Sequence, residues 1–247
     1  MRLTVLGGTG AWPGADQACS GYLVEHDGFR LLLDPGYATL PRLARYAPAE
    51  RIDAVYVSHG HPDHCADLNP LLRARTLGDE PPAPLPVYAP PGALDVVLAL
   101  DRPGMLDGGY QLREFVPGAS FEIGPFRGDT RLLPHWVPNA GVRLAAGSRV
   151  LAYTGDTGPD PGVVELARGA DLLLADATYP DEVPEDSRRY LTDAGQAGRQ
   201  ATLADVGHLL LTHLWPGTDP ERARSAAAGT YAGRLDVATA DLVVDLT

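Results

Sequence analysis

The sequence contains no lysine. All 20 of its basic residues are arginine, against 32 aspartates and glutamates, and the formal net charge is −12. It also lacks any run of basic residues, which proteins use to neutralise the phosphates of long nucleic acids. We therefore expect no large nucleic-acid partner. A small anionic substrate held by metal ions remains compatible with this composition, because bound cations dominate the field around them.

Cysteine is scarce, and long apolar runs are absent. The two cysteines, Cys19 and Cys65, cannot build a disulfide framework, so a reducing compartment is the simpler expectation. No apolar stretch approaches the ~20 residues of a membrane-spanning helix. The first residues lack the apolar stretch and cleavage site of a signal peptide. These absences predict a cytoplasmic protein with no membrane association.

Hydrophobic residues nevertheless make up 45% of the 247 residues, which is enough for a sizeable core. There is no internal repeat, low-complexity tract or linker that would divide the chain. We expect residues 1–247 to form a single domain. These features are compatible with a monomer and with a homodimer.

The hydrophobic pattern changes along the chain. Strands are predicted first, with few helices between them, at 2–6, 21–25, 29–33, 54–58, 86–89, 111–116, 120–123, 130–134, 141–145 and 149–153. Helices of this part are predicted at 40–46, 63–72 and 92–100. Beyond residue 160, helices at 161–168, 193–206 and 219–231 alternate with strands at 171–175 and 208–212. This order indicates an α/β protein with stacked sheets and helices outside them.

One segment concentrates the histidines. Three of the seven histidines and one aspartate fall in Ser58-His-Gly-His-Pro-Asp-His64, directly after a predicted buried strand. Transition metals need several imidazole or carboxylate ligands that converge at about 2.0–2.2 Å. A turn that leaves a strand can direct His59 and His61 at one ion, while Asp63 and His64 face a second. The segment therefore predicts a metal site rather than an ordinary polar loop.

This segment resembles the HxHxDH signature of the metallo-β-lactamase superfamily. The rest of that family's pattern follows in order: His135 after a strand, Asp156 in Thr154-Gly-Asp-Thr157, and His213 in Leu211-Thr-His213. The resemblance covers essentially the whole chain and implies an αββα four-layer sandwich. It also implies that His59, His61 and His135 hold one metal, that Asp63, His64 and His213 hold a second, and that Asp156 bridges the two.

The resemblance further implies the chemistry. A ligand set of nitrogen and oxygen suits two Zn²⁺ ions, and Mn²⁺ or Fe also fits. Two metals ~3.5–4 Å apart activate a bridging water for attack on phosphorus or a carbonyl carbon. Asp63 would then be a catalytic proton shuttle as well as a ligand. Asp34, in Leu33-Asp-Pro-Gly36, resembles an aspartate that supports the family's ligands, although an aspartate before proline is also common in plain turns.

Other features resemble the phosphodiesterase branch of the family, which includes ribonuclease Z and cyclic phosphodiesterases. They include the opening Leu6-Gly-Gly-Thr-Gly10 and Asp176-Ala-Thr-Tyr179, in which Asp176 would support the ligands. One departure is important. The branch usually carries a histidine that protonates the leaving alkoxide, and here Leu191 takes its place. Leucine cannot transfer a proton. Tyr190, Asp193 or His208 would have to substitute, or the substrate has an easier leaving group or is no phosphodiester.

Four residues are candidates for binding substrate. Arg188 and Arg189 could reach a phosphate through bidentate hydrogen bonds, although such a pair is more often a solvated surface. Trp136 and Trp215 each lie close to an expected ligand, and they form either the wall of a pocket or part of the core.

We expect a small-molecule substrate. The leading hypothesis is hydrolysis of a small phosphodiester, with a cyclic nucleotide as one example. The alternative is a lactone, thioester or other carboxyl derivative cleaved on the same metal core. Processing of tRNA ranks third, because the chain is acidic and shows no basic arm.

Overall fold

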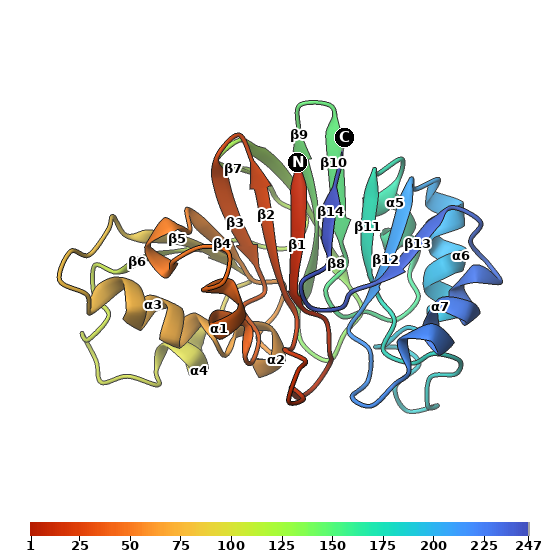
Figure 1. The fold of residues 1–247 in the computed structure, drawn as a ribbon, viewed down its shortest axis with the longest axis horizontal. Helices are drawn as coiled ribbons and strands as arrows, with labels where there is room; N and C mark the ends of the chain where they lie inside the picture. Colours follow the sequence, from red (N-terminus) through yellow and green to blue (C-terminus); the bar gives the residue numbers. More distant parts are fainter. Residues whose placement is uncertain (247) are drawn as a thin grey trace.

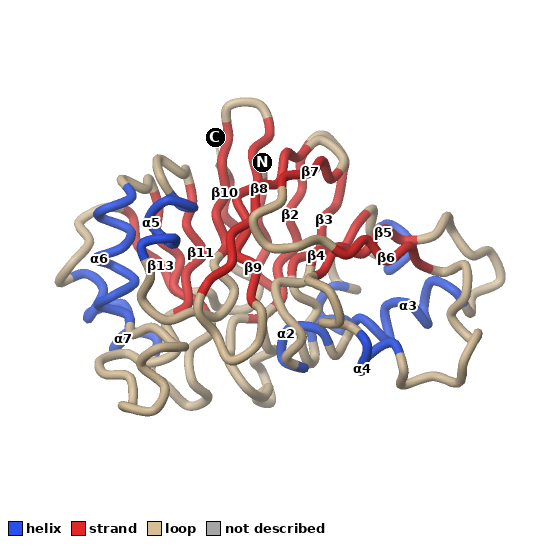
Figure 2. The backbone as a smooth tube through the Cα atoms, turned by 180° about the vertical axis from the view of Figure 1, so that it is seen from behind, coloured by secondary structure: helices blue, strands red, loops and turns tan. Residues whose placement is uncertain are grey.

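Two seven-stranded sheets form the centre of the protein (Figure 1). The computed structural model describes residues 1–246. The strand order is β14-β1-β2-β3-β4-β5-β6 in the first sheet and β13-β12-β11-β10-β9-β8-β7 in the second. Figure 2 shows the strands gathered in the middle and the helices on the two outer sides. This is the predicted αββα four-layer sandwich.

Short elements dominate both halves of the chain. The strands of the first sheet are β1 (Arg2–Gly7), β2 (Gly21–His26), β3 (Phe29–Leu33), β4 (Ala54–Tyr56), β5 (Leu85–Ala89), β6 (Tyr110–Glu114) and β14 (Val243–Asp245). Those of the second are β7 (Ser120–Ile123), β8 (Phe126–Leu133), β9 (Asn139–Ala146), β10 (Arg149–Tyr153), β11 (Leu172–Asp176), β12 (His208–Thr212) and β13 (Arg234–Val237). The helices are α1 (Thr39–Leu43), the 3₁₀ turn η1 (Ala49–Arg51), α2 (Pro62–Cys65), α3 (Leu68–Thr76), α4 (Asp95–Leu98), α5 (Pro161–Ala167), α6 (Ala194–Ala204) and α7 (Pro220–Ala228).

Three apolar cores hold the four layers together. The central core lies between the sheets and joins residues such as Tyr22 and Leu31 of the first sheet to Phe126 and Leu144 of the second. A second core lies between the first sheet and helices α1–α4, and a third lies between the second sheet and α5–α7. Because both faces of each sheet are covered, the central strands are buried throughout and mostly apolar, as Leu172–Asp176 and His208–Thr212 illustrate.

The strand directions bring chemically active loops to one edge. Strands β3 and β4 run parallel, as do β10, β11 and β12, and β8 shares their direction because it lies two antiparallel steps from β10. The carboxyl ends of parallel strands meet at the same edge of a sheet, where ligands usually bind in α/β proteins. Every predicted metal ligand follows the end of β4, β8, β10 or β12.

One predicted helix is interrupted in the structure, so this prediction is wrong. The helix expected over 63–72 is two helices, α2 and α3, separated near Asp67. Pro70 explains the break, because within a continuous helix its ring would clash with the carbonyl of residue 66. Starting α3 at Leu68 places Pro70 in the first turn, where proline is tolerated. Asp67 uses the gap to accept a hydrogen bond from the Leu40 amide at 2.8 Å.

The first and last described residues lie close together, since the Leu246 amide donates to the Met1 carbonyl at 2.9 Å. Figure 1 shows both ends at the edge opposite α2. Among residues 1–246, no helix is both long and apolar enough to cross a membrane.

Two residues of β8 should differ in how much they contribute to stability, because only one of them lies in the central core. On β8, Phe126 is fully buried and packs on Phe29 with ring centroids 6.1 Å apart, whereas Leu132 is 59% exposed. We expect Phe126→Ala to lower the free energy of unfolding by about 3–5 kcal/mol because it leaves a cavity between the sheets. Leu132→Ala should change it by less than about 0.5 kcal/mol. Urea unfolding measures both, and equal losses would contradict the two-sheet core.

Candidate metal centre

The seven predicted ligands lie together at the carboxyl edge of the sheets. They form two groups, and the ligand atoms of each group lie within 4.8 Å of one another. The first ligand group contains His59, His61, His135 and Asp156, and the second contains Asp63, His64, Asp156 and His213. Asp156 belongs to both. The ligands come from one loop of the first sheet, after β4, and from three loops of the second, after β8, β10 and β12, so only the packed sandwich brings them together.

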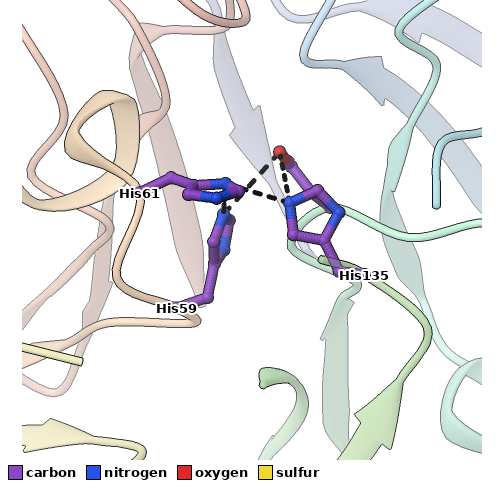
Figure 3. Close-up of side chains that lie close together, drawn as sticks. His59, His61 and His135 are labelled. Carbon is purple, nitrogen blue, oxygen red and sulfur yellow. Dashed lines mark hydrogen bonds and ion pairs between the residues drawn. The ribbon is translucent and has the colours of Figure 1, made fainter. Parts of the chain in front are cut away.

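The first ligand group is a triangle of imidazoles (Figure 3). Nε2 of His59 lies 3.1 Å from Nδ1 of His61, and Nε2 of His135 lies 3.0 Å from the same His61 atom. Nε2 of His59 and Nε2 of His135 are each 3.8 Å from Oδ2 of Asp156. Figure 3 shows the three rings pointing toward one another, with His59 and His61 on one loop and His135 on the facing strand end.

The second ligand group adds a carboxylate to two imidazoles. Nε2 of His213 lies 3.2 Å from Oδ2 of Asp63 and 3.1 Å from Oδ2 of Asp156. Nε2 of His64 lies 3.1 Å from Oδ1 of Asp156. Oδ2 of Asp63 is also held by the Ala11 amide at 2.7 Å. Oδ2 of Asp156 thus lies near imidazoles of both groups, and Oδ1 lies near His64 of the second.

Local backbone geometry makes these approaches possible. Gly155 has a φ of 60°, and a Cβ there would collide with the side-chain oxygen of Asn139. A Cβ at Gly10 would come within 2.7 Å of the His213 ring. His213 itself has a φ of 59°, an uncommon conformation that costs energy and recurs at functional sites.

Asp34 holds the ligand His64 and its surroundings through buried hydrogen bonds. It is fully buried, and its carboxylate accepts hydrogen bonds from the Ser58 amide at 2.7 Å, the Ser58 hydroxyl at 2.6 Å and the Tyr153 hydroxyl at 2.6 Å. Oδ2 also lies 2.8 Å from Nδ1 of His64. An acceptor at Nδ1 keeps the proton there and leaves Nε2 of His64 free to bind a cation.

Three other ligand histidines also have polar partners on the ring nitrogen that faces away from the cluster. Nδ1 of His59 lies 3.0 Å from the Ser58 hydroxyl, and Nδ1 of His135 lies 3.0 Å from the Tyr190 carbonyl. Nδ1 of His213 lies 2.9 Å from the Thr178 hydroxyl, which donates to Asp176 at 2.6 Å. Asp176 therefore reaches His213 through Thr178, since its own carboxylate is 3.9 Å away.

The protonation of the cluster suits metal binding. Burial lowers the pKa of His59 well below its ordinary value, and it lowers the pKa of His61 and His135 as well. These rings are neutral near pH 7 and offer lone pairs. At His64 and His213 burial also favours the neutral form, but Asp156 and Asp63 together, by their charge and by hydrogen bonds to carboxylates, outweigh it and raise the pKa of both. The two carboxylates in this group thus demand positive charge, which metal ions supply.

Two buried atoms strengthen this fit. Among the described residues, neither Nε2 of His64 nor Oδ1 of Asp156 makes a hydrogen bond of acceptable geometry, although they lie 3.1 Å apart. Unsatisfied buried polar atoms are costly, and a shared cation would satisfy both. Thiolate takes no part, because burial raises the pKa of Cys65 to about 12 and its sulfur faces the His61 carbonyl at 3.4 Å.

Comparison with known proteins agrees with this geometry. Residues 29–214 match the model of the beta-lactamase superfamily domain. The chain belongs to the metallo-β-lactamase superfamily. The probable metallo-hydrolase YhfI of Bacillus subtilis is 32% identical over 98% of this chain and 99% of that protein. Its crystal structure superimposes with a TM-score of 0.90 at 30% identity, covering 98% of both chains. Ribonuclease Z of Haloferax volcanii is 29% identical over 96% of this chain and 92% of that protein.

This family membership makes the protein a metallo-hydrolase of the metallo-β-lactamase fold, with a cluster that could hold metal ions.

The candidate substrate residues of this metallo-hydrolase lie in different settings. The Trp136 ring packs edge-on against His135 at 5.0 Å, and Trp215 follows His213 by two residues. Both are exposed, by 50% and 38%, so neither belongs to the core. Arg188 pairs with Glu182 at 2.5 Å and Glu185 at 2.6 Å, a solvated arrangement. The Arg189 guanidinium lies 5.8 Å from the centre of the Tyr190 ring.

Several supporting residues escape sequence reasoning. Ser58, Tyr153 and Thr178 have no distinguishing pattern of their own, although each stands within three residues of a ligand or of Asp176. Trp12 is the clearest omission, because its ring packs against Trp215 at 5.3 Å. Only its position just after the Gly-Gly-Thr-Gly loop could have indicated it.

The two aspartate–histidine pairs of this fold allow a matched test. Asp34–His64 is buried at 2.8 Å, whereas Asp236–His208 is partly exposed at 2.9 Å. We expect Asp34→Ala to cost about 3–5 kcal/mol of unfolding free energy, because four donors lose their acceptor in the interior. It should also weaken metal binding roughly 10–100-fold. Asp236→Ala should cost about 0–1 kcal/mol. Chemical unfolding and metal titration give these values, and a mild Asp34→Ala variant would refute the supporting role.

Proposed function

We propose that this protein is a dinuclear-metal hydrolase that cleaves a small phosphodiester, of which a cyclic nucleotide is one example. The observation that carries the proposal is the pair of adjoining ligand groups that share Asp156. A single buried carboxylate that lies near imidazoles of both groups, through Oδ2 for His59, His135 and His213 and through Oδ1 for His64, is suited to bridging two cations.

The residues divide as follows. His59, His61 and His135 would hold the first ion, Asp63, His64 and His213 the second, and Asp156 both. A nitrogen and oxygen ligand set is suited to Zn²⁺, and Mn²⁺ or Fe would fit it as well. When bound, such ions lower the pKa of a coordinated water and polarise the oxygen of the group under attack.

Other residues of the chain orient the histidine ligands, and one carboxylate accepts a proton. Asp34, Thr178 and the Tyr190 carbonyl hold His64, His213 and His135 in place from behind. Asp63 is 8% exposed, and the Ala11 amide fixes its carboxylate. We assign Asp63 the role of accepting the proton of the attacking water, because it is the ligand carboxylate closer to solvent: Asp156 is 2% exposed.

Two features favour a small phosphodiester as substrate. Residues Asp176-Ala-Thr-Tyr179 resemble the phosphodiesterase branch, and Asp176 with Thr178 supports His213. Relatives named ribonuclease Z cover nearly the whole chain. The net charge of −12 disfavours a long polyanion, so a small diester is the better match.

Of the three predicted proton donors for the leaving group, only one borders a ligand group. His208 opens β12 at the end opposite His213, roughly 17 Å away at about 3.3 Å per residue. Asp193 caps α6 by accepting from the Gln196 amide at 2.8 Å. Tyr190 borders the first ligand group, because its ring packs on Trp136 at 4.9 Å. We therefore assign the proton transfer to Tyr190.

A second candidate function rests on Leu191. This side chain is 5% exposed and offers no proton at the place where the phosphodiesterase branch carries a histidine. Hydrolysis of a lactone, thioester or other carboxyl derivative needs less help of this kind. A panel of phosphodiesters and lactones, compared by kcat/KM on the metal-loaded protein, separates the two functions.

Because both ligand groups share Asp156, its removal should affect both metal sites. We expect close to two transition-metal ions per chain by elemental analysis, and loss of activity with a chelator. Asp156→Ala should reduce activity by more than about 100-fold and lower occupancy of both sites, since ligand loss exceeds the 10–100-fold typical of supporting residues. His208→Ala should keep both near the parent value. Similar losses in the two variants would show that the ligand assignment is wrong.

Leaving-group chemistry gives a further prediction. With Tyr190 as the acid, kcat should depend only weakly on leaving-group pKa across a series of aryl and alkyl diesters. Tyr190→Phe keeps the ring but removes the proton, so it should steepen this dependence and slow alkyl diesters by about 10²–10⁴-fold. Activated aryl diesters should change little. A parent enzyme with a steep dependence that Tyr190→Phe does not alter would mean that no residue supplies the proton.

A further inference from the structure

Exposed aromatic rings border the ligand cluster at its first end. Trp136 contacts the His135 ring at 5.0 Å and the Tyr190 ring at 4.9 Å, and it is 50% exposed. The Tyr190 carbonyl faces Nδ1 of His135, so the second ring is tied to the same ligand. We call Trp136 and Tyr190 the first aromatic platform.

A second set of rings borders the opposite end. Trp215 packs against Trp12 at 5.3 Å and against Tyr179 at 5.9 Å, with interplanar angles of 82° and 13°. Trp12 follows directly after Ala11, whose amide holds Asp63, and Trp215 lies two residues beyond His213. We call Trp12, Tyr179 and Trp215 the second aromatic platform.

The distribution of tryptophan is uneven. The chain has three tryptophans, and all of them belong to these platforms. They are 51%, 50% and 38% exposed, although large aromatic side chains usually bury most of their surface. Exposed tryptophan faces beside a metal centre are suited to stacking on planar rings of a substrate, which is worth about 1–3 kcal/mol per nucleobase.

We propose that the two aromatic platforms bind two planar rings, one on each side of the scissile phosphoryl group. The substrate is then a linear diester between two ring-bearing groups, with a dinucleoside monophosphate as its chemical class. This inference rests on the proposed phosphodiesterase function. Stacking needs no basic channel, which accords with the absence of lysine and the acidic charge. A cyclic nucleotide carries a single base and would occupy one platform only.

Two activated substrates test the platforms separately. Thymidine 5′-(p-nitrophenyl) phosphate carries a ring on each side of phosphorus, and methyl p-nitrophenyl phosphate carries the nitrophenyl ring alone. In the parent, kcat/KM for the first should exceed that for the second by roughly 5–150-fold, which corresponds to one stacked base. Of Trp136→Ala and Trp215→Ala, one should reduce this ratio to near one. The other should lower both rates and keep the ratio.

Matched variants exclude indirect effects. Trp136→Phe and Trp215→Phe retain an aromatic ring, so they should keep most of the kcat/KM that the alanine variants lose. If the tryptophans had a purely structural role, activity would not depend on whether an aromatic ring is present. Leu203→Ala, on an exposed side chain of α6, should leave both rates unchanged. A parent ratio near one, or a ratio that neither alanine variant alters, would overturn the platforms. Failure of the metal-loaded parent to cleave methyl p-nitrophenyl phosphate would instead overturn the phosphodiesterase function.

Inhibition tests the two-ring substrate itself. Against methyl p-nitrophenyl phosphate, dithymidine monophosphate should have an inhibition constant roughly 5–150-fold lower than thymidine 3′,5′-cyclic monophosphate, because it offers a second base. Trp136→Ala and Trp215→Ala should each abolish this difference. Equal inhibition of the parent by the two compounds would show that only one ring is bound.

Discussion

The buried carboxylate of Asp34 joins the two sheets beneath the ligand cluster. It follows β3 of the first sheet, receives the Tyr153 hydroxyl from β10 of the second, and is bonded to Ser58 at the start of the histidine loop. A charge buried this deeply is tolerable only when hydrogen bonds surround it. The same bonds fix the spacing of the sheets where Nδ1 of His64 meets this carboxylate. The position of the second ligand group relative to the first therefore depends on Asp34.

The electrostatics of the cluster follow from its burial. His59, His64 and Asp156 have almost no exposure, so the attraction between carboxylates and cations is stronger there than in water. The first ligand group keeps its imidazoles neutral, and the second concentrates the negative charge. Together they form a centre that is incomplete without positive ions. The acidic surface would repel anions, so the attraction for a phosphodiester would have to come from this centre.

The loops around the cluster carry two different kinds of residue, one that orients the histidines and one that is exposed to solvent. The partners behind the histidines are small and polar, namely Ser58, Thr178 and a backbone carbonyl, and they hold rings in fixed directions. The residues in front, Trp136 and Trp215, are large and exposed. The first set suits chemistry that recurs throughout the superfamily. The second set suits recognition, which is where members of one fold differ most from one another.

The sequence by itself determined the fold class and the identity of the clustered residues. Strand positions were readable because β-branched and leucine-rich runs between turn residues have few alternatives, and the histidine loop was readable because its spacing is specific. The continuity of 63–72 was wrong, since Pro70 allows a helix there only if it starts anew, and the helix expected over 92–100 is reduced to the single turn α4. The tertiary structure alone decided which groups face one another. Asp34 and Tyr153 are 119 residues apart, and Trp12 and Trp215 still farther, so their contacts depend on how the two sheets pack and not on any local pattern.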